Sequence, residues 1–516
     1  FLAGINNSPN KYNPYDSEKD HSELIKSRTL TVLKEMKSQG YITNEDEYNA
    51  AVAKVEAGLT FKKGNTASTY SYSYHTQAAV EQVVEQVMKE KGLSEDFARK
   101  YVYSSGLKIY STQDTTIQSR VEEETTKTKY VVSGKEKDPK TNELKNDHTQ
   151  AAFVIIDHST GYVVGCSGGL GEREGSTLNR VTQSIRQTGS CIKPIAVLVP
   201  GISEKLFTGA TIFDDEQKEF ADGYNPENYS KYLGNITVRR ALESSQNIPF
   251  VEMMEEITPK TSMKYLKKMG ITTLSEKDEN LALALGGLDK GISPLQMASA
   301  YATIANDGVY IEPTFYTKII NSNSQIIIQT KQKKKKIFSK DVAYIVKELL
   351  TEPVKGSNGT ATYCAISGMD VAAKTGTTDE NYDRWLCGFT PYYTAVTWYG
   401  FDQNETINYN GKKNPAGILW ANIMNSVHSN LASAKFTKTS GVTKVTVCGQ
   451  TGKIANTGCP NTYEEYFLAG TKPEVCDKHS GKEINTNNSS QQNTYNTTNK
   501  KTDTVTNSFD TTTTDD

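Results

Sequence analysis

Residues 151–166, AAFVIIDHSTGYVVGC, decide the fold of this chain of 516 residues. The two apolar runs, at 151–156 and 162–166, have the length and the β-branched content of buried strands. Between them, residues 157–161 have the composition of a tight turn that ends in glycine. The stretch therefore predicts an antiparallel β-hairpin.

A second pair of strands is predicted farther along the chain, at 385–390 and 394–400, around a turn at 391–393. Between the two strand pairs the pattern is mainly helical. Ser293 and Pro294 are typical of a helix start, as N-cap and first helical residue. A hairpin, a long helical middle and then two or three strands favour one antiparallel β-sheet flanked by helices. We therefore predict an α+β fold.

Helical patterns also precede the hairpin, so the chain is expected to begin with an α-rich region. Apolar residues recur at helical spacing in 22–39, 44–57 and 76–91, and Gly92 follows the last of these patterns. The second helix of this region is followed by a Ser/Tyr-rich stretch at 68–74, which is either a strand or a linker. The shorter predicted elements are a strand at 107–112, a strand at 326–328 and a solvated turn at 333–336.

Composition narrows the class of protein. Lys and Arg number 58 and Asp and Glu number 60, so the net charge is −2 and no basic excess points to a nucleic-acid partner. The sequence contains no apolar run of about 18 residues, the length that a membrane span needs. Because the first residue is Phe1, we expect the chain to be part of a longer protein. Residues 485–516 are mainly Asn, Ser, Thr, Gln and Asp, and they are predicted to be a disordered tail.

Cysteine and histidine are scattered, which limits the chemistry. Of the seven cysteines, only Cys448, Cys459 and Cys476 share a neighbourhood, and neither C-x-x-C nor H-x-x-x-H accompanies them. Buried thiols or one disulfide are favoured there over a structural metal, so neither a metal nor a cofactor is expected. No G-x-S-x-G motif is present, and we expect any general base to be a residue other than His.

The strongest candidate for chemistry is the stretch GSCIKP at 189–194, which precedes an apolar helical run at 195–199. Ser190 and Lys193 are three residues apart and project from the same face of a helix. A neutral lysine is a usable base for a serine hydroxyl if burial or nearby cations lower its pKa. Cys191 is an alternative nucleophile, but the spacing to the lysine favours Ser190.

A second short motif, Ser245-Gln246-Asn247, lies where a helix is expected to end at Pro249. Its hydroxyl and carboxamide could point into one cleft, one to relay a proton and the other to hold a substrate amide. Helix capping explains the same residues.

The third motif is Lys374-Thr375-Gly376-Thr377-Thr378, after a run of small residues that leads into a strand. Gly376 allows another backbone to approach closely, and the lysine and the hydroxyls can hold a carboxylate. A strand end followed by a turn is the alternative interpretation.

The three motifs occur in the order of S-x-x-K, S-D-N and K-T-G, which form one penicillin-recognising acyl-transfer site, although Gln246 replaces the Asp of the second motif. On these motifs the sequence resembles the transpeptidase portion of class A (bifunctional) penicillin-binding proteins of Gram-positive bacteria. The resemblance covers about residues 1–480. It includes the stretches 106–114, 179–190, 286–302, 383–391 and 459–476.

The resemblance implies a domain organisation. It consists of a glycosyltransferase tail and helical linker at 1–60, an interdomain linker at 61–112, a transpeptidase domain at 113–430, a small C-terminal extension at 431–484 and the tail at 485–516. The Glu-Asp pairs at 45–46 and 95–96 do not match the family's E-D-x-x-F-x-x-H motif, so glycosyltransferase activity is not expected here. The family's membrane anchor lies before that domain, so the full-length protein is expected at the extracytoplasmic face of the membrane.

The resemblance also assigns roles to the motifs. Ser190 would attack the D-Ala–D-Ala bond of a peptidoglycan stem peptide, and Lys193 would accept its proton. Lys374 would help to keep Lys193 neutral. Ser245 would relay the proton to the leaving group, and Asn247 would grip the donor peptide.

The remaining positions are implied to bind substrate: Thr375, Gly376, Thr377 and Thr378, with Thr375 and Thr377 holding the carboxylate. The backbone N–H groups of Ser190 and Thr377 would form the oxyanion hole. The implied partners are donor and acceptor stem peptides, β-lactam antibiotics, and cell-division or elongation proteins. The alternatives are a D-Ala-D-Ala carboxypeptidase, a β-lactamase and a β-lactam-binding sensor without catalysis.

Overall fold

The computed structural model describes residues 1–479, except 6–7, 9–10, 17–18, 62–71, 136–146, 174–176, 221–222, 410 and 412. These residues form two compact units. The smaller is Phe1–Tyr72 with Arg173–Ser176, and the larger is Ser73–Glu172 with Thr177–Asp516. The predicted disordered tail at 485–516 and most of the stretch at 68–74 lie outside the described residues. Within the described ranges, none of the helices combines the length and apolar character that crossing a bilayer requires.

The smaller unit is helical, as predicted. Its helices are α1 (Leu2–Ile5), α2 (Ser22–Ser38) and α3 (Glu45–Glu56). The side chain of Asn44 caps α3 by accepting hydrogen bonds from the backbone N–H groups of Asp46 and Glu47, which is the usual role of Asn at an N-cap.

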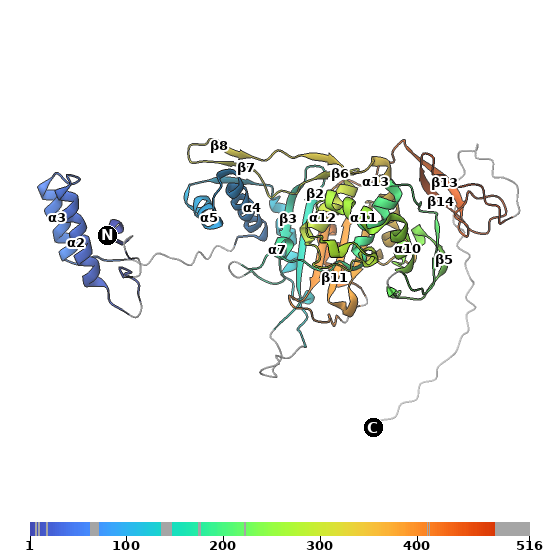
Figure 1. The fold of residues 1–516 in the computed structure, drawn as a ribbon, viewed down its shortest axis with the longest axis horizontal. Helices are drawn as coiled ribbons and strands as arrows, with labels where there is room; N and C mark the ends of the chain where they lie inside the picture. The colour runs from blue at the N-terminus through green and yellow to red at the C-terminus, as the bar shows by residue number, and fades with distance from the viewer. Residues whose placement is uncertain are drawn as a thin grey trace, which may run out of the picture. The chain divides into compact units, whose positions relative to one another are not determined.

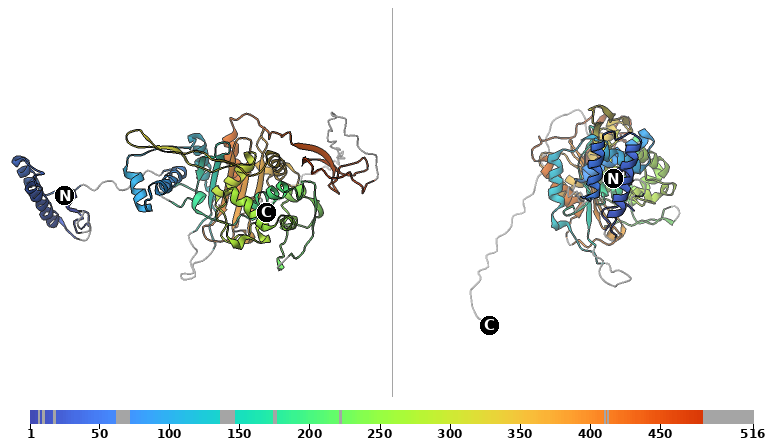
Figure 2. Two further views of the ribbon diagram at one scale, coloured as in Figure 1. Left: turned by 45° about the horizontal axis from the view of Figure 1, so that its top comes forward. Right: turned by 90° about the vertical axis from the view of Figure 1, so that its left-hand side faces the viewer.

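The larger unit is built on a five-stranded antiparallel sheet with strand order β10-β11-β12-β2-β3. The predicted hairpin forms β2 and β3, and the second predicted pair forms β11 and β12. Val154 of β2 pairs with Val396 of β12, so strands far apart in the sequence are neighbours. The left view of Figure 2 shows the cyan strands of the hairpin beside the orange strands from the C-terminal half. The bounds are β2 (Gln150–Asp157), β3 (Tyr162–Ser167), β10 (Ala372–Thr377), β11 (Asp383–Phe389) and β12 (Thr394–Gly400).

Helices cover both faces of this sheet, which explains why β2 is apolar at every position from Ala151 to Ile156. Ala152, Val154 and Ile156 join the core that includes α12 (Pro294–Ala305). The intervening residues of β2 join a second core with α6 (Thr115–Thr125) and α14 (Pro415–His428). Figure 1 shows the helices gathered around the sheet.

Residues 73–112 pack as part of the larger unit, where an interdomain linker at 61–112 was expected. Helices α4 (Tyr74–Lys91) and α5 (Glu95–Ser104) share a core with a three-stranded sheet of order β1-β7-β8. Its strands are β1 (Lys108–Ser111), β7 (Tyr316–Ile320) and β8 (Ile326–Gln329). His75 is buried and lies 2.6 Å from the carbonyl oxygen of Val163, which joins α4 to β3.

Two predictions in the helical middle were wrong. The helix expected to end at Pro249 ends at Glu243, and Pro249 lies in the first turn of the next helix, α10 (Ile248–Ile257). A proline suits that position because the first N–H groups of a helix have no intrahelical partner. The turn predicted at 333–336 contains strand β9 (Lys334–Lys336), whose backbone pairs with β6 (Val309–Ile311) while its three side chains are exposed.

The other elements of the larger unit connect these layers. They are the helices α7 (Arg180–Gln183), α8 (Val199–Ser203), α9 (Val238–Glu243), α11 (Pro259–Lys268) and α13 (Lys340–Lys355), and the paired strands β4 (Ile212–Asp215) and β5 (Gly234–Thr237). The short 3₁₀ helices are η1 (Thr128–Tyr130), η2 (Gly189–Ile192), η5 (Glu276–Asp278), η6 (Leu281–Leu285), η7 (Thr362–Cys364) and η8 (Asp379–Asn381), and η3 (Pro194–Leu198) is a π-helix.

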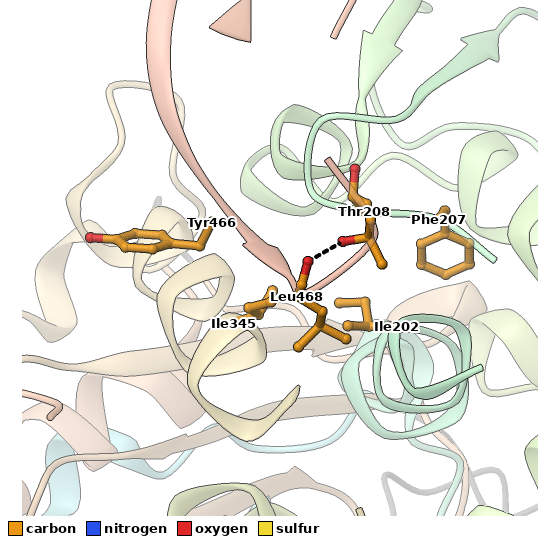
Figure 3. A pocket seen from close by; sticks show the side chains of 7 residues that line it. Ile202, Phe207, Thr208, Ile345, Tyr466 and Leu468 are labelled. Atoms are coloured by element: carbon orange, nitrogen blue, oxygen red, sulfur yellow. Dashed lines mark hydrogen bonds between the residues drawn. The ribbon is translucent and has the colours of Figure 1, made fainter. Parts of the chain in front are cut away.

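The C-terminal segment forms a two-stranded hairpin, β13 (Val442–Cys448) and β14 (Thr462–Leu468). Its end packs on helices of the larger unit. Figure 3 shows Leu468 beside Ile345 of α13 and Ile202 of α8, at a small apolar pocket. Apolar side chains therefore hold one end of the hairpin against the rest of the larger unit, to which the hairpin belongs.

Candidate active site

Ser190 lies in η2 at the wall of a cleft of about 530 Å³. The turn depends on Gly189, whose φ is +49°. A Cβ atom at this position would lie 2.3 Å from the carbonyl oxygen of Thr377, so any side chain there would collide with β10. The serine and the strand that carries the third motif are therefore held close together.

Lys193 is fully buried behind Ser190 and reaches the second motif. Its Nζ atom donates hydrogen bonds to the carbonyl oxygens of Ser245 and Gln246, at 2.9 and 2.7 Å, and lies 2.7 Å from Asn247 Oδ1. Burial lowers the pKa of Lys193 well below its ordinary value, and the charge of Lys374 lowers it further, against the opposing effect of Asp215. Both effects favour the neutral amine of Lys193 over its charged form.

Lys374 is also fully buried, and it holds the hydroxyl of Ser245. Its Nζ atom donates to Ser245 Oγ at 2.7 Å and to the carbonyl oxygen of Thr375 at 2.9 Å. Burial lowers the pKa of Lys374 to about 8, although the nearby thiols of Cys191 and Cys387 oppose this shift. Lys193 of the first motif and Lys374 of the third motif therefore both contact Ser245 of the second motif.

Ser245 has a left-handed backbone with φ of +62°, in the link between α9 and α10. This conformation is uncommon for a residue other than glycine and is characteristic of functional sites. It directs the carbonyl oxygen toward Lys193 while the hydroxyl meets Lys374. The adjacent Asn247 lines the cleft and donates to the carbonyl oxygen of Glu227 at 2.6 Å.

The threonines of the third motif lie at different places. Thr377 and Thr378 line the cleft, and Thr377 Oγ1 accepts a hydrogen bond from Arg384 at 3.2 Å. Thr375 is not among the cleft-lining residues, and its hydroxyl donates to Thr360 at 2.8 Å. A Cβ atom at Gly376 would lie 2.5 Å from the carbonyl oxygen of Thr188, so this glycine permits close approach of the two backbones, as expected.

Cys191 points away from the cleft. It is fully buried, and its thiol donates to the carbonyl oxygen of Lys374 at 3.1 Å. Tyr301 donates to the carbonyl oxygen of Cys191 at 2.7 Å. These contacts give Cys191 a packing role, whereas Ser190 lines the cleft.

The structure adds cleft residues that the motifs did not identify. Gln187 exchanges two hydrogen bonds with the backbone of Leu288, at 2.5 and 2.9 Å, and its own carbonyl oxygen accepts from the Trp385 indole at 2.7 Å. Gln187 therefore ties the nucleophile segment to two other parts of the wall. The remaining cleft residues include Tyr224, Glu227, Leu285, Gly286, Asp379, Glu380 and Asn404.

Asp383 fixes the end of the third motif through hydrogen bonds and an ion pair. Its carboxylate lies 2.7 Å from Arg186 Nε and accepts from the Trp398 indole at 2.7 Å, and its backbone N–H donates to Thr378 Oγ1 at 2.9 Å. The only signal for Asp383 in the sequence was its place within the resemblance at 383–391.

Comparison with known proteins finds similarity over most of the chain. Residues 151–425 match the family described as the penicillin binding protein transpeptidase domain, and residues 438–481 match the penicillin-binding protein 1A C-terminal domain. The chain is 32% identical over 507 residues to penicillin-binding protein 1A of Clostridium botulinum, across 94% of this chain and 60% of that protein. It is 34% identical over 415 residues to penicillin-binding protein 1F of Bacillus subtilis, across 79% and 53%.

Two solved structures show the same fold. Penicillin-binding protein 1A from Haemophilus influenzae aligns with a TM-score of 0.64 at 20% identity, over 92% of this chain and 85% of that one. The PonA1 protein from Mycobacterium tuberculosis, in complex with penicillin V, aligns with a TM-score of 0.58 at 24% identity, over 70% and 96%. The chain spans about 60% of the length of the clostridial relative.

Proposed function

Because this chain belongs to the penicillin-binding protein transpeptidase family, we propose that it is a serine D,D-transpeptidase that cross-links peptidoglycan stem peptides. One observation carries the proposal. Three motifs from distant parts of the chain converge at one cleft, where Lys193 and Lys374 both contact the Ser245–Asn247 link beside Ser190.

The reaction begins with acylation. Neutral Lys193 takes the proton of the Ser190 hydroxyl, and Ser190 Oγ attacks the carbonyl carbon between the last two D-alanines of the donor peptide. The backbone N–H groups of Ser190 and Thr377 stabilise the oxyanion. Ser245, held by Lys374, passes its proton to the departing D-Ala nitrogen and regains one from the protonated Lys193. The products are an ester on Ser190 and free D-Ala.

Deacylation completes the cycle. The amine of a neighbouring stem peptide attacks the ester carbonyl carbon, the C–O bond to Ser190 breaks, and an amide cross-link forms. The proton of the amine returns to the serine through the same lysine and serine groups. Asn247, Gly376, Thr377 and Thr378 position the donor, and Thr375 supports the strand that carries them.

The same proposal covers partners and location. The partners are donor and acceptor stem peptides, β-lactams that acylate Ser190, and cell-division or elongation proteins, at the extracytoplasmic face of the membrane. The proposal assigns no glycan polymerisation to these residues, because the sequence contains no E-D-x-x-F-x-x-H motif. Glycan polymerisation by this chain from a lipid-linked precursor would contradict that part.

Fluorescent penicillin tests the nucleophile. The wild-type chain should carry one covalent label at Ser190, and Ser190→Ala should carry none. Cys191→Ala is the matched control, because it removes the neighbouring nucleophile and should still label. Covalent labelling of Ser190→Ala would overturn the assignment, and failure of the wild type to label would favour a non-catalytic binding role.

Product analysis separates the related activities. With a stem peptide as donor and an amine acceptor, the proposal expects cross-linked product. Release of D-Ala without cross-linking would instead identify a carboxypeptidase. Rapid release of bound penicillin would identify a β-lactamase, since a transpeptidase deacylates slowly.

A further inference from the structure

The C-terminal segment brings three cysteines and one histidine to a single point. The Sγ atoms of Cys448, Cys459 and Cys476 and a ring nitrogen of His479 all lie within 4.8 Å of one another. His479 Nδ1 is 3.5 Å from Cys448 Sγ and 3.2 Å from Cys476 Sγ. We propose that these four residues bind a structural zinc ion.

The spacing of the four atoms fits tetrahedral zinc. Zinc binds thiolate sulfur at about 2.3 Å and imidazole nitrogen at about 2.0–2.1 Å, so neighbouring donors in a tetrahedron are roughly 3.5–3.8 Å apart. The two measured sulfur–nitrogen distances, 3.5 and 3.2 Å, are close to this separation. Three sulfurs and one nitrogen are a donor set that selects zinc over harder cations such as Mg²⁺ and Ca²⁺. Four protein ligands leave no position for substrate, so the ion is structural.

Neighbouring groups orient the proposed ligands. His479 Nε2 lies 3.0 Å from Gln450 Oε1, and a proton on Nε2 leaves the lone pair of Nδ1 facing the sulfurs. Thr451 Oγ1 donates to Cys476 Sγ at 3.3 Å, and the backbone N–H of Asn456 donates to Cys459 Sγ at 3.4 Å. Donors directed at sulfur stabilise thiolates, the form that binds the metal.

The ends of the ligand loops are fixed by a further side chain. Asn456 Nδ2 donates to the carbonyl oxygens of Cys476 and His479, at 2.7 and 2.8 Å. This amide links the turn before Cys459 to the stretch that carries the last two ligands. The four donors therefore come from three chain segments that are already aligned.

A metal ion would stabilise this C-terminal segment, which has little apolar core of its own. Val447 and Phe467 of the β13–β14 hairpin share a small core with Ala210, which precedes β4, while Val442 and Leu468 join the main core. A two-stranded hairpin with little core is marginal in water, and small units commonly use a metal or disulfides instead. Zinc would join the end of β13, the 456–459 turn and the 476–479 stretch at one point.

A disulfide explains the cluster less well. It would join two sulfurs and leave the third thiol beside it, and it would give no role to the imidazole. All three cysteines are free thiols in the structure. Zinc binding uses all four groups at once.

The test measures metal in the purified chain. Elemental analysis after exhaustive dialysis should find about one zinc per chain in the wild type. Cys459→Ser, Cys476→Ser and His479→Asn should each reduce the zinc content at least fivefold. His148→Asn and Cys364→Ser are matched controls outside the cluster, and both should retain the zinc. Replacement by Co²⁺ should give the thiolate charge-transfer and d–d bands of a tetrahedral site.

Each contrary outcome is distinguishable. Wild-type chain without zinc, with a disulfide among the three cysteines in non-reducing mass spectrometry, would overturn the proposal. So would zinc that persists in all three ligand variants, or a different metal in the wild type. Because Ser190 is remote in sequence from this cluster, penicillin labelling of the same samples reports separately on the proposed transpeptidase and on folding of the larger unit.

Discussion

At the scale of single residues, the two buried lysines explain how the cleft can run acyl transfer near neutral pH. Burial disfavours the charged form of both lysines, and the nearby charge of Lys374 lowers the pKa of Lys193 further. The result is a division of roles. In the proposed mechanism Lys193, whose pKa is lowered well below its ordinary value, is the proton acceptor, while Lys374, with a pKa of about 8, keeps its charge at neutral pH.

This division predicts the alkaline side of the pH profile. Above about pH 8, Lys374 loses its proton, so its attraction for the carboxylate of penicillin disappears and its hold on Ser245 weakens. Titration of one such group should lower the second-order rate constant of acylation roughly tenfold between pH 7 and pH 9. Stopped-flow labelling measures the rate, and circular dichroism over the same range controls for unfolding. A rate that stays constant through pH 9 would contradict the role of Lys374.

Gly286 packs closely against Gly189, so a larger residue at position 286 is expected to displace the segment that carries Ser190. Its φ is +87°, and a Cβ atom there would lie 2.5 Å from the carbonyl oxygen of Gly189 and 2.6 Å from its nitrogen. Gly286→Ala should therefore displace the serine and slow acylation by roughly 100-fold, since small misplacements have such effects.

Gly171→Ala is the matched control for that variant. Gly171 has nearly the same φ, +85°, but a Cβ atom there meets nothing within 4 Å. Both variants carry similar backbone strain, so a difference between them isolates the contact with Gly189. Equal acylation rates in the two variants would show that the close approach is not needed.

At the scale of elements, the C-terminal hairpin is joined to the rest of the larger unit by a buried ion-pair cluster as well as by apolar contacts. Arg239 of α9 lies 2.6 Å from Glu465 of β14 and 2.7 Å from Glu352 of α13. The Glu465 side chain is fully buried. A buried carboxylate that loses its partner is costly, so this arginine couples the three elements.

Removal of that arginine should destabilise the larger unit. Arg239→Met leaves Glu465 buried without its partner and should lower the free energy of unfolding by about 3–5 kcal/mol. The double variant Arg239→Met with Glu465→Leu should recover much of this loss. Urea denaturation followed by circular dichroism measures both. Lys277→Ala, at the exposed pair with Asp289, is the control and should cause no measurable change. Equal stability of the single and double variants would contradict the cluster's role.

At the scale of the whole molecule, we propose that the catalytic part begins near residue 73. The larger unit starts at Ser73, and α4 and α5 provide apolar side chains to the core they share with β7 and β8. His75 is buried against β3, and burial lowers its pKa to about 4, so it is neutral in the folded protein near pH 7.

Two truncations test this boundary. A chain that starts at residue 73 should fold and should bind penicillin within about twofold of the wild-type rate. A chain that starts at residue 113 loses α4, α5 and β1 and should aggregate or unfold, because β7 and the face of β3 become exposed. Penicillin labelling and thermal melting measure both. A stable, active chain starting at residue 113 would restore the boundary expected from the resemblance.

Local sequence patterns were enough to predict much of the fold. The hairpin at 151–166, the strands at 385–400 and the helices before the sheet follow from strand length, helical spacing and turn residues, which act over a few neighbouring positions. The errors arose where local preference does not decide the outcome. Pro249 is equally compatible with a helix start, and the backbone of Lys334–Lys336 pairs with β6 without burying its side chains.

The sequence by itself determined the order and spacing of three motifs, and hence the family and the candidates Ser190, Lys193, Ser245, Asn247 and Lys374. Only the tertiary structure decided which atoms meet. The contact of Lys193 with Asn247, and the joining of Cys448, Cys459 and Cys476 with His479, close long loops. Loop closure is set by the packing of the whole unit, because its entropic cost must be offset by contacts far from the residues that are brought together.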